Sequence, residues 1–289
     1  MIRSMTGFAR RERQGPWGTL TCELRSVNHR YLELSLRLPD DLRGLENDAR
    51  QLLSGSLRRG KVDAGVYLKG APAGATSLDI NPAAIEQLLA GAAAVRAAAG
   101  EAVGTLNPLD VLRWPGVIRD AERDVTPIAT AAMGLLEETA ADLNEARARE
   151  GARIRGMLVQ RCEAMRDLVA LVHARLPEVA ARIRARVLER VAQLGTTVDA
   201  ERLEQEIALL AYKMDVEEEL DRLGSHITET LQVLDSKEPA GRRLDFLMQE
   251  FNREANTLSS KSQDSETTRA ALDMKVLIEQ MREQVQNVE

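Results

Sequence analysis

The chain has few aromatic residues and few cysteines. Phe, Trp and Tyr together make up 3% of its 289 residues, so stacking on many aromatic side chains cannot be its main means of holding a ligand. Its two cysteines, Cys22 and Cys162, lie far apart and match no zinc-ligand spacing. This pattern indicates two reduced thiols and argues against a disulfide framework or a zinc site.

Membrane segments and the common catalytic motifs are also missing from the sequence. No apolar run approaches the roughly 20 residues of a membrane-spanning helix, and the first residues, MIRSMTGFARRER, contain no apolar segment typical of a signal peptide. We therefore expect a cytoplasmic protein without membrane contact. The sequence contains no P-loop, dinucleotide fingerprint, HExxH or GxSxG motif.

Charge is unevenly distributed along the chain. Residues 1–70 hold 13 basic and 8 acidic side chains, a balance of +5, whereas the whole chain carries −6. The remaining residues therefore carry −11. This separation suits a basic part that grips an anion and an acidic part that binds metal ions. It also suits simple attraction between the two parts, which is the commoner case.

Residues 1–70 show the period-two alternation of half-buried strands. Leu20, Cys22 and Leu24 alternate with polar residues, and four leucines alternate over 32–38. The polar stretch 26–30 between them predicts a hairpin turn or bulge. Further strands at 2–13 and 62–68, and a helix from about 39 to 57, complete a small N-terminal antiparallel-sheet α/β unit.

The rest of the chain reads as helical. A small-residue linker at 70–77 precedes helices expected at 82–99, after Pro108, and from 126 to about 195 with a break near Pro177. The predicted fold class is α+β. Its predicted parts are a basic sheet unit at 1–70, a helical middle region with long antiparallel helices at 71–200, and a C-terminal helical region at 201–289.

Two predicted helices carry unusual polar faces. In a helix over residues 241–263, the apolar side chains form a stripe along one face. The opposite face carries Asp245, Gln249, Asn252, Arg253 and Asn256. Asparagine is a poor helix former, so this side is an uncommon choice for bulk solvent. It indicates either a surface that holds a metal, a phosphate or a partner helix, or a hydrogen-bonding seam between subunits.

An acidic helix is expected over residues 199–225. Asp215, Glu219, Arg222 and His226 are spaced i, i+4, i+7 and i+11, and Glu218 borders that face. Carboxylates near a histidine can hold Mg²⁺ or Mn²⁺, or can transfer protons. An ion-paired helix surface would show the same pattern.

Longer motifs at both ends of the chain identify a family. The segments SMTGF at 4–8, RSVNHRYLE at 25–33 and RGKVD at 59–63 resemble the N-terminal signatures of the YicC/YloC family of bacterial endoribonucleases. The segments GRRLDFL at 241–247, QEFNREANTL at 249–258, SKS at 260–262 and IEQMREQVQN at 278–287 resemble its C-terminal signature. The acidic segment 215–226 is similar to the family's pattern as well.

The resemblance implies a cytoplasmic endoribonuclease that depends on a divalent metal, Mn²⁺ or Mg²⁺, and cleaves single-stranded or loop regions of RNA in RNA turnover. It also implies a homohexamer around a central channel, with residues 201–289 as the catalytic region. The metal ligands expected on this basis are Asp215, Glu218, Glu219, Asp245, Glu250 and Glu254.

The remaining candidate residues have roles in catalysis or RNA binding. His226 is expected to act as acid or base, and Arg253 and Lys261 to neutralise charge on the phosphate. The expected catalytic residues are thus His226, Asp245, Glu250, Arg253, Glu254 and Lys261. Contacts to the RNA backbone are expected from Arg25, His29, Arg30, Arg242 and Arg243.

Two alternatives to the enzyme remain open. One is a non-catalytic RNA-binding adaptor that delivers RNAs to another nuclease and so has other RNA-decay proteins as partners. The other is a structural oligomer whose polar seams only specify assembly. The acidic net charge favours the metal-dependent enzyme, because carboxylates repel RNA unless a cation intervenes.

Overall fold

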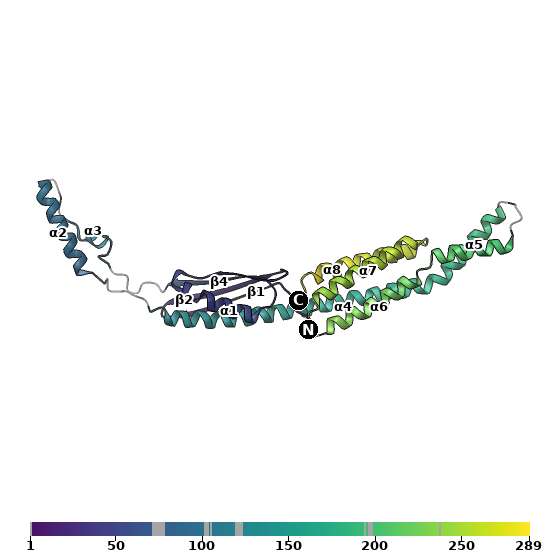
Figure 1. Cartoon of the computed structure of the whole chain (residues 1–289), viewed down its shortest axis with the longest axis horizontal. Coiled ribbons are helices and arrows are strands. Elements are labelled where there is room, and N and C mark those ends of the chain that lie inside the picture. Colours follow the sequence, from purple (N-terminus) through teal and green to yellow (C-terminus); the bar gives the residue numbers. More distant parts are fainter. Residues whose placement is uncertain are drawn as a thin grey trace.

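A computed structural model describes residues 2–70, 79–100, 104, 106–118, 124–193, 195, 199–236 and 238–289. The molecule is elongated, with the sheet on one side of the two chain termini and the C-terminal helices on the other (Figure 1). Helix α4, Thr126–Gln193, packs against the sheet along its first part and against the C-terminal helices along its second. The predicted linker lies, apart from Gly70, outside the described residues.

The sheet is mixed, with strand order β1-β2-β4-β3. Strand β2 (Gly18–Val27) pairs antiparallel with both β1 (Gly7–Gly15) and β4 (Gly60–Gly70). Strand β3 (Leu32–Arg37) pairs parallel with β4. The predictions of an entirely antiparallel sheet and of a hairpin at 26–30 are therefore wrong. A 3-10 helix at Asp40–Leu45 and helix α1, Glu46–Ser56, form the crossover that parallel pairing requires.

The sheet buries one face under α1 and α4. The alternation places Leu20, Cys22 and Leu24 of β2 in this core, together with Val62, Ala64 and Val66 of β4. Residues from Ile128 to Leu143 of α4 complete it. With a four-stranded sheet followed by a mainly helical region, the α+β prediction is confirmed.

Two of the predicted helix boundaries are wrong. Helix α4 continues through Pro177, although proline removes one hydrogen bond from a helix interior. The neighbouring turns are held by packing, since Val172 is buried and Leu176 packs on the C-terminal core. Conversely, the predicted helix at 199–225 is divided into α5 (Ala200–Lys213) and α6 (Glu217–Asp235), and the residue before α6, Val216, is non-helical (φ −123°, ψ 10°) and buried.

The C-terminal core forms where α6, α7 (Gly241–Lys261) and α8 (Ser265–Val285) pack with α4. The apolar stripe of α8 is buried in this core through Met274, Ile278, Met281 and Val285. The closing helix therefore docks within its own chain. Helices α2 (Pro82–Ala99) and α3 (Pro108–Leu112) lie at the far end beyond the sheet (Figure 1). No helix among the described residues is long and apolar enough to cross a membrane.

Both chain ends meet at a buried arginine of α4. Ser4 and Val288 form an antiparallel bridge. The Arg147 side chain donates hydrogen bonds to the carbonyl oxygens of Ser4 (2.7 Å) and Arg59 (3.3 Å), and to the carboxylate of Glu289. Arg147 is fully buried, and burial lowers its pKa. This one guanidinium therefore ties both termini and the turn before β4 to α4.

We predict that Arg147→Met strongly destabilises the protein. The substitution leaves the Glu289 carboxylate and two carbonyl groups without their donor, and removing one partner of a buried ion pair costs about 3–5 kcal/mol. Urea unfolding followed by circular dichroism measures the change. Arg149→Met is the matched control, because Arg149 is exposed and pairs with Glu145 on the same helix. Equal stability of the two variants would contradict the structural role of Arg147.

Both cysteines should be unreactive while the protein is folded. Burial raises the pKa of the Cys22 and Cys162 thiols to about 11. At pH 8 only about one thiol in a thousand would then be ionised, against roughly a quarter for an ordinary thiol of pKa ~8.5. We expect slow modification by Ellman's reagent in buffer and rapid modification of two thiols in urea. Rapid modification of the folded protein would show that these cores open readily.

Candidate metal centre on helices α6 and α7

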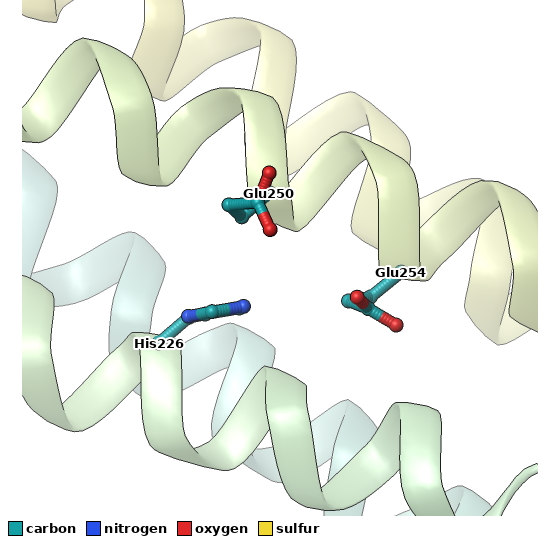
Figure 2. Close-up of side chains that lie close together, drawn as sticks. All are labelled: His226, Glu250 and Glu254. Carbon is teal, nitrogen blue, oxygen red and sulfur yellow. The ribbon is translucent and has the colours of Figure 1, made fainter.

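Three of the predicted site residues meet between two antiparallel helices. His226 extends from α6, and Glu250 and Glu254 extend from successive turns of α7 (Figure 2). One ligand atom from each residue can be chosen so that all lie within 4.8 Å of one another. We call this group the His226–Glu250–Glu254 cluster.

Core packing sets the position of the cluster. Glu250 and Glu254 are four residues apart, so they occupy the same face of α7. Between them in sequence, Phe251 is fully buried. The imidazole of His226 packs edge-on against the Phe251 ring, with the ring centroids 5.8 Å apart and the planes at 79°. The buried ring thereby supports His226 next to the two carboxylates.

The cluster holds more negative charge than its neighbours neutralise. Glu254 is only 3% exposed, and its carboxylate lies 3.4 Å from Nη1 of Arg222. Arg222 also pairs with Glu218, and these two carboxylates raise its pKa. Because neighbouring negative charges repel each other, a further cation between the two carboxylates is stabilising.

The donor set fits a divalent transition-metal ion. An imidazole nitrogen with two carboxylate oxygens is a mixed nitrogen and oxygen set, which suits a first-row ion such as Mn²⁺ better than Mg²⁺ with its preference for oxygen. No other group of three His, Cys, Asp or Glu side chains in the described part of the chain lies close enough together to hold a metal ion.

Three other predicted ligands are engaged elsewhere. Nζ of Lys261 lies 2.9 Å from the buried carboxylate of Glu219 and 3.0 Å from the carbonyl oxygen of Asp215. The Asp215 carboxylate accepts the backbone N–H of Glu217 at 3.0 Å, at the start of α6. Glu218 pairs with Arg222. The break before α6 thus separates Asp215 from the face on which the sequence pattern expected it.

Asp245 and Arg253 lie on the exposed side of α7. Asp245 is five residues from Glu250, about 140° around the helix, and its carboxylate accepts a hydrogen bond from Gln249 at 3.1 Å. The structure therefore does not bring Asp245 to the cluster. Arg253 is exposed next to Glu254, and no carboxylate of the described residues pairs with it.

The residues predicted to bind RNA form two groups. Arg25 is exposed in β2, on the sheet face opposite the core. His29 and Arg30 lie in the connection to β3, where the Arg30 guanidinium stacks on the Tyr31 ring at 5.3 Å. Arg242 and Arg243 lie in the first turn of α7, and Arg243 pairs with Glu229 of α6.

The two chain ends meet at the bridge between Ser4 and Val288, which we call the terminal junction, and this junction brings the two groups close to each other. The amide of Asn28 donates to the carbonyl oxygen of Gln286 at 2.6 Å, and Nε of Arg59 donates to the carbonyl oxygen of Arg30 at 3.0 Å. At the start of α7, a Cβ on Gly241 would lie 2.4 Å from the Val288 carbonyl oxygen. Glycine at 241 thus allows α7 to begin against the C-terminal segment, near Arg59.

Sequence reasoning missed three residues that lie near the cluster or the start of α7: Arg59, Glu229 and Phe246. It placed Arg222 on the same helix face as His226 but gave it no role. Arg222, His226 and Glu229 are spaced i, i+4 and i+7, and this spacing could have assigned Glu229 to the same face. Phe246 lies off the apolar stripe of α7 and is exposed. An aromatic residue in that position is the signal that could have found it.

Comparisons with known proteins match the chain along its whole length. Residues 2–156 match the family model described as endoribonuclease YicC-like, N-terminal region, and residues 172–289 match endoribonuclease YicC-like, C-terminal. The probable endoribonuclease YicC of Haemophilus influenzae is 41% identical over 289 residues, covering all of both chains. The protein of the same name from Clostridioides difficile is 28% identical over 296 residues, again covering both chains fully.

The contact between Lys261 and Glu219 predicts a structural role for this lysine. Lys261→Met should destabilise the protein, because the Glu219 carboxylate loses its cation and its other oxygen, also buried, has no hydrogen-bond donor among the described residues. An unsatisfied buried group costs about 1–3 kcal/mol, and more when it is charged. The double variant Lys261→Met, Glu219→Gln should regain most of the lost stability in urea unfolding.

The same pair of variants separates folding from catalysis. If the double variant is stable and cleaves RNA, Lys261 serves only the fold. If it is stable and has lost cleavage, the predicted catalytic role of Lys261 is supported. A Lys261→Met variant as stable as the parent protein would contradict the structural role.

Proposed function

Because the chain belongs to the YicC-like endoribonuclease family, we propose that it is a divalent-metal-dependent endoribonuclease that cleaves single-stranded or loop regions of RNA and acts in RNA turnover. We further propose a cytoplasmic location and a homohexameric assembly. The observation that carries the proposal is the His226–Glu250–Glu254 cluster, since a half-buried imidazole and two carboxylates concentrate metal ligands where the family's signature residues lie.

Within this proposal, His226, Glu250 and Glu254 hold Mn²⁺ or Mg²⁺. The bound ion would supply Lewis-acid stabilisation of negative charge on the phosphate. An imidazole nitrogen that binds a metal cannot accept a proton at the same time. The metal-binding role of His226 and its predicted acid–base role are therefore alternatives at that nitrogen.

The arginines around the cluster differ in what they contact: some pair with carboxylates and others are available to bind RNA. Arg222 pairs with both Glu218 and Glu254 beside the site. Arg253 is exposed next to Glu254 and has no carboxylate partner among the described residues, which leaves its guanidinium available for a phosphate oxygen. Arg30, Arg59, Arg242 and Arg243 lie toward the other end of α7. Their charge supports an RNA path that runs from the terminal junction to the cluster.

A non-catalytic RNA-binding adaptor is the second candidate function. The exposed basic residues at the junction would serve an adaptor equally well. The cluster distinguishes the two candidates, because an adaptor has no need of a partly buried pair of carboxylates that weakens RNA binding.

We predict that Glu254→Gln and Glu250→Gln each abolish cleavage of a labelled RNA hairpin in Mn²⁺. Each variant should also weaken Mn²⁺ binding more than ~100-fold, because changes around the ligands alone cost about 10–100-fold. Calorimetry or electron paramagnetic resonance measures the affinity, and a denaturing gel measures cleavage. The parent protein should cleave RNA and spare DNA of the same sequence, and EDTA should stop the reaction.

Glu283→Gln on α8 is the matched control, since it makes the same change at an exposed carboxylate and should leave both measurements unchanged. Cleavage that persists in excess EDTA would refute the metal requirement. Tight RNA binding by the parent protein without cleavage in any divalent metal would favour the adaptor.

A further inference from the structure

Phe246 is exposed beside the cluster. It is 46% exposed, whereas Phe251 on the same helix is fully buried. A single exposed apolar side chain is ordinary in folded proteins. What sets Phe246 apart is its surroundings, because charged groups from two helices lie around it and one of them holds its ring.

Arg243 covers one face of the ring. Its Cζ atom lies 5.2 Å from the centroid of Phe246, and its guanidinium also pairs with the carboxylate of Glu229 on α6. The guanidinium is therefore fixed from both sides. A ring stacked on a fixed guanidinium is itself restrained, and the remaining exposed surface offers a flat apolar face.

Phe246 lies one helical turn before Glu250. Residues 246, 250 and 253 follow the spacing i, i+4 and i+7, so Phe246 and Arg253 flank Glu250 on the same side of α7. One helical turn is ~5.4 Å along the axis, comparable to the length of one nucleotide in an extended strand. A phosphate at the cluster would thus place a neighbouring base within reach of the Phe246 ring.

We propose that Phe246 is a base-stacking residue: it receives the face of an unpaired nucleobase next to the phosphate that binds at the His226–Glu250–Glu254 cluster. The inference rests on the proposed function and deepens it, because a base can stack on Phe246 only when it is free of a helix. Phe246 would then favour loops and single strands over duplexes. The adjoining cations Arg243 and Arg253 fit a ligand that combines a flat ring with a phosphate.

The test compares RNA hairpins that differ in one base. Wild-type protein first defines the main cleavage position in the loop, and an abasic nucleotide then replaces the residue on either side of it. Stacking on an aromatic side chain is worth about 1–3 kcal/mol per base, so Phe246→Leu should slow cleavage of the intact hairpin roughly 5- to 150-fold. On one of the two abasic hairpins, wild-type protein should be slowed similarly and Phe246→Leu should add no further loss.

Fluorescence provides a readout that does not require cleavage. With 2-aminopurine at each loop position in turn, in a hairpin that carries a 2′-deoxy nucleotide at the cleavage position and with Mn²⁺ present, wild-type protein and Phe246→Trp should quench one position, whereas Phe246→Leu should not. Tyr212→Ala, a change at an exposed aromatic residue of α5, should behave as wild type. Light scattering should give the same mass for all variants.

The other possible results distinguish the stacking role of Phe246 from the proposed nuclease activity. Quenching without cleavage by wild-type protein would support the stacking site and refute the nuclease. Cleavage without quenching, or an equal loss by Phe246→Leu on intact and abasic hairpins, would overturn the stacking role and leave the nuclease standing. A lower mass for Phe246→Leu would also overturn it, because Phe246 would then belong to a contact between subunits.

Discussion

The buried guanidinium of Arg147 is the contact on which the arrangement of the two halves depends. Helix α4 runs from the sheet to the C-terminal helices, and a single helix by itself leaves the rotation of its neighbours undetermined. Arg147 binds Ser4, Arg59 and Glu289 at once, so the start of the sheet unit and the end of α8 are fixed to the same point of α4. The loop with Arg30 reaches the beginning of α7 through contacts to Arg59 and Gln286 that this point holds in place.

Between α6 and α7, charged side chains follow one another along the seam. Arg243 meets Glu229, then come the His226–Glu250–Glu254 cluster, Arg222, and finally Lys261 with Glu219. Every carboxylate on this line except Glu250 has a basic partner within ion-pair distance. The charge left over is therefore concentrated at one place, and it lies between Phe246 and Arg253. A binding site for a cation and a phosphodiester needs such a local excess of negative charge beside an exposed positive one.

The sequence predicted what depends on local periodicity and failed where contacts between distant segments decide. The apolar stripe of residues 244–258 correctly predicted α7, and the alternation around Leu20 to Leu24 correctly predicted β2. The sequence pattern could not predict that β3 pairs parallel with β4, because this pairing depends on β4 lying between β2 and β3 in the sheet. Helix spacing placed Asp215 with Glu219, but the helix is interrupted between Lys213 and Glu217. That His226 meets Glu250 and Glu254 follows from the packing of α6 on α7, which no single-helix pattern contains.

The fold also changes where a partner subunit would be expected. The apolar stripe of α8, which could otherwise join subunits, is buried within the chain. Helix α2, by contrast, buries none of its side chains, and apolar residues from Leu89 to Trp114 on α2, α3 and the segments around them are exposed. In proteins most helical stability comes from the packing of an apolar face. The surface that gains most from covering in the proposed hexamer is therefore α2 with α3, at the far end of the sheet from the cluster. An assembly through that end would leave α6 and α7 accessible to RNA.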